Sequence, residues 1–274
     1  MKTSTKNRQI NGLLIPFLIL ATIFTSCTES IEFEFDSAAP QLVVEAMVPE
    51  SQFAEVILSK TIDFNTENNN NTVSQATVML EDESGNSEIL QEVSPGHYRS
   101  TKIKGIPGSS YSLSVQTKEN LSQVKSVDRM PKPVFIKRLR VRESIMPEVE
   151  GVKMPEWEVI VEYNDPADEV NYYRFIEYVN GEVVASYVEN DRLNNGKENK
   201  SFLTNVDLKL NKGDTLTIEM QSISKAVFEY FYGFSTLNNI TQGSNTTNPV
   251  SNISGANLGY FSAHTVHRRS VVVE

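Results

Sequence analysis

The sequence predicts a mainly β protein with two β-sandwich domains and one helix in the second domain. Short runs of alternating apolar and polar residues recur between Leu42 and Val273, and turn residues separate them. The stretch 225–240 differs, because its apolar residues fall at helical spacing. The two prolines in Met130-Pro131-Lys132-Pro133 lack the backbone N–H that pairs one strand with the next. We therefore expect a domain boundary here, with domains at residues 41–131 and 132–274.

The expected N-terminal sandwich is indicated by runs of strand length. These runs are Leu42–Val48, Glu55–Ser59, Ala76–Glu81, Glu88–Val93, His97–Arg99 and Tyr111–Val115. Turns such as Ser84-Gly85-Asn86 and Gly105-Ile106-Pro107-Gly108 separate them. About seven short strands with turns at this spacing are typical of a sandwich.

The expected C-terminal sandwich shows the same pattern and a clear hairpin. Its runs are Phe135–Val141, Glu156–Tyr163, Tyr172–Val179, Glu182–Val188, two runs around Leu208–Leu210 and Leu216–Ile218, Leu258–Ala263 and Thr265–Val273. Asn180-Gly181 joins two of them, and both residues accept the positive φ of a two-residue hairpin turn. The polar stretch Arg192–Asn199 is expected to be a loop.

The stretch Lys225–Ile240 is the predicted helix. Val227, Phe231 and Phe234 recur at helical spacing, and Ser224 can cap the N-terminus. Such an aromatic stripe either packs against a sheet or forms a platform for a ligand. On the second interpretation, the candidate ligand or partner residues are Phe228, Tyr230 and Tyr232.

Residues 1–26 have the features of a lipoprotein signal peptide. A basic start precedes the apolar run Leu13–Phe24, which is too short to span a membrane. Phe24-Thr25-Ser26-Cys27 resembles the lipobox of bacterial lipoproteins, with Phe24 in place of the usual leucine. This resemblance implies cleavage before Cys27 and its acylation, as with palmitate; the alternative is an ordinary secretory signal with an incidental cysteine.

The composition of the mature chain excludes several classes of function. Residues 1–26 hold three of the 25 Lys and Arg and none of the 35 Asp and Glu, so the chain from Cys27 onward has a net charge of −13. This charge disfavours nucleic acid as a partner. Because Cys27 is the only cysteine, its acylation leaves no thiol for a disulfide, a zinc site or a nucleophile.

Residues 27–40 are expected to form an acidic tether. Four acidic residues lie between Glu29 and Asp36. An acidic patch soon after the lipidated cysteine resembles the export signal of Bacteroidota lipoproteins that reach the cell surface. The alternative is a solvated linker.

Two short motifs resemble the O-glycosylation signal of exported Bacteroidota proteins. They are Asp36-Ser37-Ala38 and Asp214-Thr215-Leu216. The resemblance makes Ser37 and Thr215 candidate glycosylation sites.

The sequence shows no catalytic, cofactor or metal-binding motif. His264 and His267 are three residues apart and point to opposite faces of a strand, and His97 has no ligand partner nearby in the sequence. The acidic turns Glu81-Asp82-Glu83 and Asp165–Glu169 lack the spacing and glycine of an EF-hand loop, which favours solvated turns over calcium sites. We therefore expect neither an enzyme nor a cofactor.

A series of motifs resembles one family along most of the chain. The motifs are Leu42-Val43-Val44-Glu45, Val56–Thr61, Gly96-His97-Tyr98, Gly108–Leu113, Asn248-Pro249, Ser251-Asn252-Ile253 and Leu258–Ala263. In this order they resemble domain of unknown function 4249, a family of Bacteroidota lipoproteins often encoded beside TonB-dependent receptors of SusC type. The Gly-x-x-Tyr-x-Leu piece also resembles transthyretin-like sandwiches, which implies immunoglobulin- or transthyretin-like domains. The family provides no catalytic residues to assign.

Three functions are consistent with these observations. The first is an accessory lipoprotein on the outer surface of the outer membrane that works with a SusC-type TonB-dependent receptor in nutrient uptake. The second is an adhesin or glycan- or protein-binding module without a transporter, and the third is an undetected hydrolase. For the first, the expected contact loops are Asp63–Thr72 and Gln242–Gly255, where asparagine and glycine leave backbone groups available.

Overall fold

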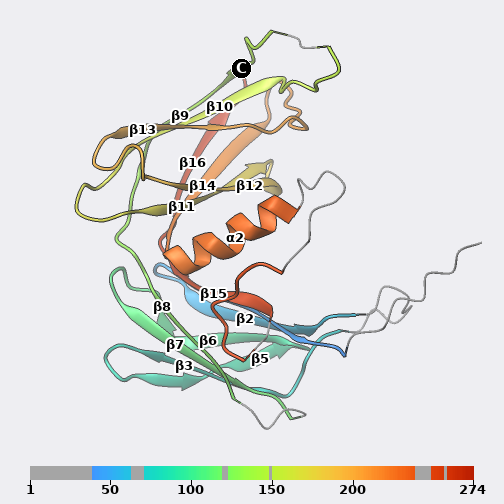
Figure 1. Ribbon diagram of the computed structural model, residues 1–274, viewed down its shortest axis with the longest axis vertical. Coiled ribbons are helices and arrows are strands. Elements are labelled where there is room, and N and C mark those ends of the chain that lie inside the picture. The colour runs from blue at the N-terminus through green and yellow to red at the C-terminus, as the bar shows by residue number, and fades with distance from the viewer. Residues whose placement is uncertain (1–38, 63–70, 119–122, 148–149, 238–247, 256–257) are drawn as a thin grey trace, which may run out of the picture. The chain divides into compact units, whose positions relative to one another are not determined.

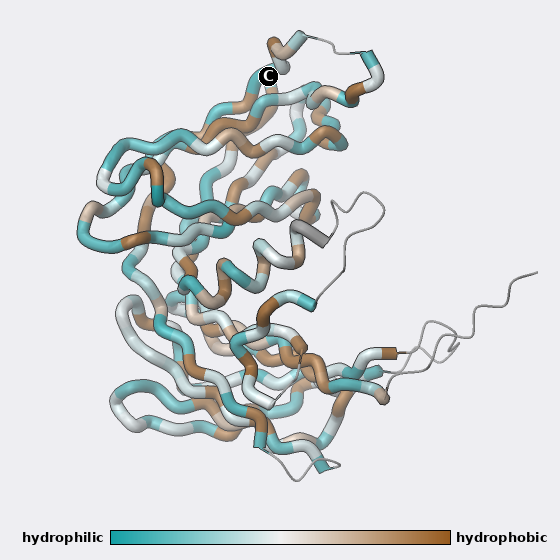
Figure 2. Tube along the Cα trace, in the orientation of Figure 1, coloured by the Kyte–Doolittle hydropathy of each residue, from teal (hydrophilic) through white to brown (hydrophobic). Residues whose placement is uncertain are grey.

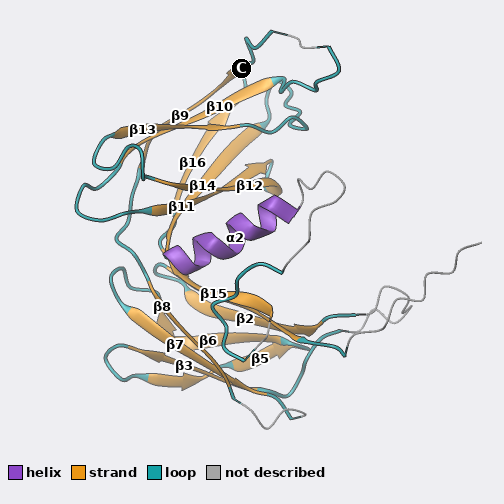
Figure 3. Cartoon of the chain, in the orientation of Figure 1, coloured by secondary structure: helices purple, strands orange, loops and turns teal. Residues whose placement is uncertain are grey.

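The computed structural model describes residues 39–62, 71–118, 123–147, 150–237, 248–255 and 258–274. Residues 39–274 form one compact unit. The described residues contain strands in four sheets and one helix (Figure 3). Two separate hydrophobic cores each lie between a pair of sheets, which confirms the predicted mainly β fold with sandwich architecture.

The first sandwich consists of a five-stranded and a four-stranded sheet (Figure 1). The five-stranded sheet has the order β15 (Leu258–His264), β1 (Leu42–Pro49), β2 (Phe53–Lys60), β6 (His97–Lys104) and β5 (Gln91–Ser94). The facing sheet has the order β4 (Ser87–Ile89), β3 (Thr77–Asp82), β7 (Ser110–Gln116) and β8 (Val124–Arg129). We call the first of these the β1–β15 sheet.

The second sandwich consists of a three-stranded and a four-stranded sheet. The three-stranded sheet has the order β13 (Glu198–Leu203), β10 (Trp157–Asn164) and β9 (Ile136–Glu143). The facing sheet has the order β12 (Glu182–Asn190), β11 (Tyr172–Val179), β14 (Thr215–Ile223) and β16 (His267–Val272). We call these the β10 sheet and the β11–β14 sheet.

Strand alternation determines which side chains form each core. In β1, Val44, Ala46 and Val48 are fully buried between the sheets, while the residues between them face outward. In β10, Val159 and Val161 occupy the equivalent inward positions of the second core. Figure 2 shows this alternation of hydrophobic and hydrophilic residues along the strands of both sandwiches.

The hairpin predicted at Asn180-Gly181 is confirmed. These residues join β11 to β12, and their φ angles are 52° and 92°. Asn180 also orders the adjacent loop, because its side-chain oxygen accepts a hydrogen bond of 2.9 Å from the Thr215 backbone nitrogen.

Two local predictions in the second sandwich are wrong. Strand β13 occupies Glu198–Leu203, which includes the end of the expected polar loop, while Leu208 and Leu210 lie in irregular backbone and not in a strand. The inward residues of β13 include Asn199 and Ser201, so the strand lacks an apolar face that its sequence could reveal. Leu208 and Leu210 are buried in the second core without belonging to a sheet.

Strand β15 departs from the expected division at residues 41–131 and 132–274. It lies near the C-terminal end of the sequence but pairs in parallel with β1, from Val43 opposite Leu258 to Pro49 opposite His264. The first sandwich therefore contains residues that were expected to belong to the second.

Helix α2 (Lys225–Leu237) begins where the sequence predicts. The Ser224 hydroxyl caps it by accepting a hydrogen bond of 3.3 Å from the Val227 backbone nitrogen. The expected continuation, residues 238–240, lies outside the described residues. The helix contacts β11 and β12 of the second sandwich and β15 of the first (Figure 1).

Candidate binding cleft

The outward faces of the β1–β15 sheet and the β11–β14 sheet line a cleft of about 340 Å³. On the first sheet, Phe53, Glu55, Arg99, Tyr260 and His264 line it, together with Met47, Pro49 and Gln52. On the second sandwich, Arg174, Ile176, Tyr178, Glu219, Gln221, Val266 and Arg268 complete the wall. We call this the inter-sheet cleft.

The strand period explains why large polar side chains gather in the cleft. In β11, Tyr173 and Phe175 point into the second core and are fully buried. Arg174, Ile176 and Tyr178 alternate with them and therefore point to the opposite face. Their cross-strand neighbours on β14 and β16 extend the same face of the sheet.

Glu219 is a fully paired carboxylate in this wall. Its Oε2 accepts a hydrogen bond of 2.6 Å from Arg268 Nε and one of 3.4 Å from the Tyr178 hydroxyl. Its Oε1 accepts a hydrogen bond of 2.6 Å from Gln221 Nε2. The Glu219 side chain is only 5% exposed, so these donors compensate a buried negative charge.

Arg174 is the opposite case, a half-buried cation without a carboxylate partner. Its Nε donates to Ser186 Oγ at 3.0 Å, and its Cζ lies 3.8 Å from the centroid of the Phe231 ring. Burial lowers the pKa of the guanidinium, and the neighbouring Tyr260 and the Glu219 carboxylate, which acts through space without forming an ion pair, oppose this effect. Among the described residues, no carboxylate forms an ion pair with Arg174.

His264 adds a neutral polar group to the cleft. It is 3% exposed, and its Nδ1 lies 2.9 Å from Ser262 Oγ. Burial lowers the pKa of His264 to about 4. The imidazole is therefore uncharged near neutral pH and can donate or accept a hydrogen bond.

The wall formed by the first sandwich combines an aromatic ring with paired charges. Glu55 lies 3.5 Å from Arg99 Nε and 3.5 Å from His97 Nε2. The Phe53 ring has Lys104 Nζ at 4.6 Å from its centroid. This wall offers an apolar surface with a charged rim.

The candidate residues on α2 lie beside the cleft and do not line it. The Phe228 ring packs 5.1 Å from Tyr172 and 5.6 Å from Tyr232, and Tyr230 packs 5.2 Å from Tyr260. Phe231 does not line the cleft either, but it contacts two residues that do, Arg174 and Tyr260. Phe228 therefore packs against a sheet, whereas Tyr232 is 55% exposed, and a role of the stripe as a ligand platform stays a prediction.

The remaining candidate residues fall elsewhere. Cys27 and Ser37 lie outside the described residues. Thr215 is half-buried at the start of β14, beside the Asn180 hairpin. His267 stacks edge-on against Phe135 with ring centroids 5.2 Å apart, away from the environment of His264.

The expected contact loops are only partly described. Residues 63–70 and 242–247 lie outside the described residues. In the described part of the second loop, the Asn252 side chain pairs with both the backbone nitrogen and the backbone oxygen of Phe261, at 2.9 and 2.7 Å. The Asn252 backbone oxygen also accepts a hydrogen bond of 2.8 Å from Ser126 Oγ, so the expectation of an available backbone group is wrong for the Asn252 carbonyl.

Another hollow of about 400 Å³ lies beside the linker at residues 130–132. Its charged residues, Arg129, Lys132, Glu169 and Lys225, are all exposed to solvent. The inter-sheet cleft is smaller but contains buried ionisable groups, so it is the better candidate for specific binding.

Sequence reasoning missed Arg174, Glu219 and His264 as residues of one cleft, because outward polar residues on a strand carry no signal that a second sheet covers them.

The described residues contain no group of three His, Cys, Asp or Glu side chains placed to hold a metal ion. None of their helices has the length and apolar character needed to cross a membrane.

The fold and the cleft define a class of protein, namely a double β-sandwich with a polar cleft between outward sheet faces. The chain belongs to the family described as domain of unknown function (DUF4249), whose model matches residues 28–270. The predicted resemblance to this family is thereby confirmed.

No curated protein matches the chain. Among solved structures, a two-domain fibronectin type III segment of chicken tenascin is 13% identical, with 67% of this chain and 91% of that chain covered and a TM-score of 0.21. The chicken interferon gamma receptor alpha chain is 10% identical, with 68% and 90% covered and a TM-score of 0.20. At these scores the similarity supports no argument about function.

Proposed function

We propose that this protein is an outer-membrane lipoprotein of the cell surface that binds a solute and acts as the accessory partner of a SusC-type TonB-dependent receptor. The observation that carries the binding role is the inter-sheet cleft, where the half-buried Arg174 guanidinium has no carboxylate partner among the described residues. Concave sites with an apolar lining and a few convergent polar groups are typical of ligand binding.

The predicted anchor supports the location and the partner. An acylated Cys27 holds the protein at a membrane, because each buried CH₂ contributes about 0.8 kcal/mol. Confinement beside a receptor raises the effective concentration of each for the other, so a modest contact surface can be well occupied. A binder outside the outer membrane cannot move its solute alone, and a TonB-dependent receptor provides that step.

The test combines crosslinking in intact cells with nutrient uptake. Wild type should crosslink to a TonB-dependent receptor, and deletion of the protein should slow the uptake of one nutrient. Cys27→Ala should leave the membrane fraction or accumulate as an uncleaved precursor, and it should lose the crosslink. Normal acyl labelling of Cys27→Ala contradicts the lipoprotein assignment, and wild type without a receptor crosslink or an uptake effect contradicts the transport role.

Exposed apolar side chains favour a second candidate, a surface adhesin or a glycan- or protein-binding module. Leu193 is 90% exposed in the loop between β12 and β13, and Phe202 is 56% exposed on the outer face of the β10 sheet. Binding to whole cells or host glycans by a strain that lacks the receptor, lost in Leu193→Ser with Phe202→Ser, supports this candidate over the first.

A further inference from the structure

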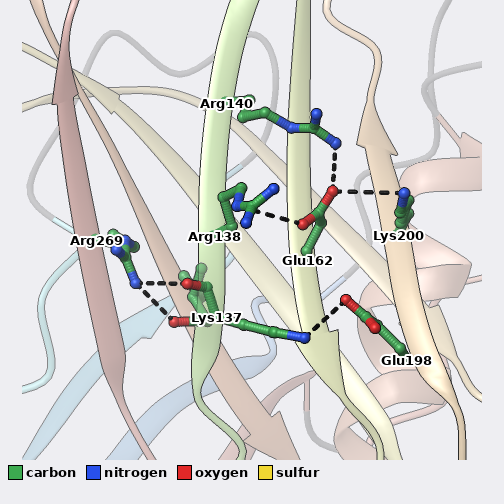
Figure 4. A network of polar contacts seen from close by, with 8 residues as sticks. Lys137, Arg138, Arg140, Glu162, Glu198, Lys200 and Arg269 are labelled. Atoms are coloured by element: carbon green, nitrogen blue, oxygen red, sulfur yellow. Dashed lines mark hydrogen bonds and ion pairs between the residues drawn. The ribbon is translucent and has the colours of Figure 1, made fainter.

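Most arginines of the second sandwich have carboxylate partners. On the outer face of the β10 sheet, Glu162 pairs with Arg138 at 3.7 Å, with Lys200 at 3.6 Å and with Arg140 (Figure 4). Arg142 pairs with Glu158 at 2.6 Å on the same face. The arginine side chains of these pairs are about half exposed, so solvent also stabilises their charges, whereas Glu162 and Glu158 are themselves buried.

Arg174 shows the opposite combination, because it is more buried and has no ion pair within the described part of the chain. This guanidinium is more enclosed than those of the β10 sheet, yet it forms no ion pair with a carboxylate among the described residues; Glu219 acts on it only through space, and Tyr260 lies beside it. One of its faces is covered by the Phe231 ring and its Nε is used by Ser186. The terminal nitrogens provide the remaining donors, in a planar geometry suited to a carboxylate.

We infer that the inter-sheet cleft binds a small organic carboxylate, whose anionic group pairs with Arg174 and whose apolar body packs against the cleft walls. This inference rests on the proposed solute-binding function. Phe53 and Ile176 provide apolar surface in the cleft, and the neutral His264 provides a hydrogen-bonding group. A volume of about 340 Å³ corresponds to roughly ten water-sized groups, at about 30 Å³ each.

The other charges of the cleft select for a single negative charge. Glu219 is satisfied by three donors, and Glu55 already pairs with Arg99. Arg99 and Arg268 offset these two carboxylates, so the cleft is left with the single positive charge of Arg174, which one anionic group neutralises and a second exceeds. A monocarboxylate with an aromatic or aliphatic body therefore fits better than a phosphate dianion.

The test is titration of the purified lipidated protein in detergent with benzoate, hexanoate, benzamide and phenyl phosphate, followed by calorimetry. At least one of the two carboxylates should bind, and benzamide and phenyl phosphate should bind more weakly. Arg174→Gln should weaken carboxylate binding about tenfold or more, because a charge-assisted hydrogen bond is lost. Arg174→Lys keeps the charge without the planar fork and should give an intermediate affinity.

Arg138→Gln is the matched control, because it removes a guanidinium from the β10 sheet and should leave binding unchanged. Thermal unfolding of each variant separates a loss of binding from a loss of fold. Three results overturn the inference: neither carboxylate binds wild type, benzamide or phenyl phosphate binds as tightly as the best carboxylate, or Arg174→Gln retains full affinity while folded.

The outcome for the ligand is distinct from the outcome for the receptor. If no carboxylate binds but wild type still crosslinks to a TonB-dependent receptor, the inference fails and the proposed function stands. If carboxylates bind and no receptor is recovered, the receptor partnership fails and the ligand class stands.

Discussion

The two sandwiches are built from similar strands but differ in the polarity of their interiors. The first core consists of aliphatic residues with Phe261 and the two tyrosines Tyr98 and Tyr111. The second sandwich also contains carboxylates between its sheets, including Glu177, which is fully buried. The first sandwich also buries two carboxylates, Glu88 and Asp128, but mostly backbone nitrogens satisfy them. Glu177 and Glu189 of the second sandwich instead accept from side chains that must be in register.

The polar partners in the second sandwich connect its two sheets. The Tyr173 hydroxyl on β11 donates to Asp165, which follows β10, and the Ser201 hydroxyl on β13 donates to Glu189 on β12. Burial raises the pKa of Glu189. Such contacts favour one alignment of the two sheets, because any other alignment leaves buried polar groups unpaired.

The largest expected effect concerns the apolar core of the first sandwich. Phe261→Ala in β15 should lower the free energy of unfolding by about 3–5 kcal/mol, because it leaves a cavity in a buried core. Denaturant unfolding measures the loss. The exposed Phe202→Ala is the control and should change stability by less than about 0.5 kcal/mol. Equal losses in the two variants would show that β15 does not stabilise the first sandwich.

A second prediction concerns Asp128, an isolated buried carboxylate of the first sandwich. It accepts a hydrogen bond of 2.7 Å from the Ala263 backbone nitrogen, and burial raises its pKa to about 6. Its contribution to stability is present below the unfolded pKa of 3.8 and is lost as the pH rises through about 6. Asparagine carries no charge at any pH, so Asp128→Asn should not lose stability over this pH range. Near pH 7 its free energy of unfolding should exceed that of wild type, by about 3 kcal/mol at most.

Unfolding of wild type and Asp128→Asn across pH 3.5 to 7.5 provides the measurement. The difference between them should be smallest at the acidic end and should grow up to about pH 6. His264 contributes in the opposite direction, because its pKa is lowered to about 4, so its stabilisation is lost as the pH falls. The contribution of His264 to stability is the same in both proteins, so it cancels in the difference between them. A difference independent of pH would refute the raised pKa of Asp128.

The third prediction concerns the polar interior of the second sandwich. Tyr187→Phe removes the hydroxyl that donates to Glu177 Oε2 at 3.2 Å, and Asn205 remains as the other donor at 3.3 Å. We expect a loss of about 1–3 kcal/mol, because a buried acceptor loses a partner. Tyr178→Phe is the matched control, since Glu219 keeps Arg268 as a donor, and it should cost less. The reverse order in urea unfolding would contradict the proposed role of the polar interior.

The smallest expected effect is at the open face of the β10 sheet. Arg138→Gln should lower stability by less than about 1 kcal/mol, because Arg138 is exposed, its contact with Glu162 is long at 3.7 Å, and the buried Glu162 keeps Arg140 and Lys200. The loss of stability in Arg138→Gln should be smaller still at high salt, because salt screens exposed charges. A salt-independent loss above about 2 kcal/mol would mean that Arg140 and Lys200 do not compensate Glu162 without Arg138.

The strands with one apolar face are predictable from the sequence, because burial of one sheet face requires that alternation. Strand β7 is such a case, with Tyr111, Leu113 and Val115 in the core. Strand β13 is not predictable in this way, because its inward residues Asn199 and Ser201 are polar. Their burial depends on partners that the opposite sheet provides, and a local window of sequence does not contain them.

The candidate site was less predictable than the fold. Alternation places Arg174 on the outward face of β11, where a polar residue is ordinary. What makes it unusual is the second sheet that covers this face and the approach of Phe231 from α2. Both depend on the path of the chain from β14 through α2 to β15, so only the tertiary structure reveals the cleft.

The parallel pairing of β1 with β15 has a consequence for the order in which the chain folds. During synthesis the N-terminal segments emerge first, so β1 is present long before the residues that pair with Val43 to Pro49. Until Leu258–His264 arrive, one edge of the first sheet has no neighbour, and the loop to be closed is most of the chain. Folding of the first sandwich is thus coupled to completion of the polypeptide. Chains that terminate before β15 should stay loosely structured and available to chaperones and proteases.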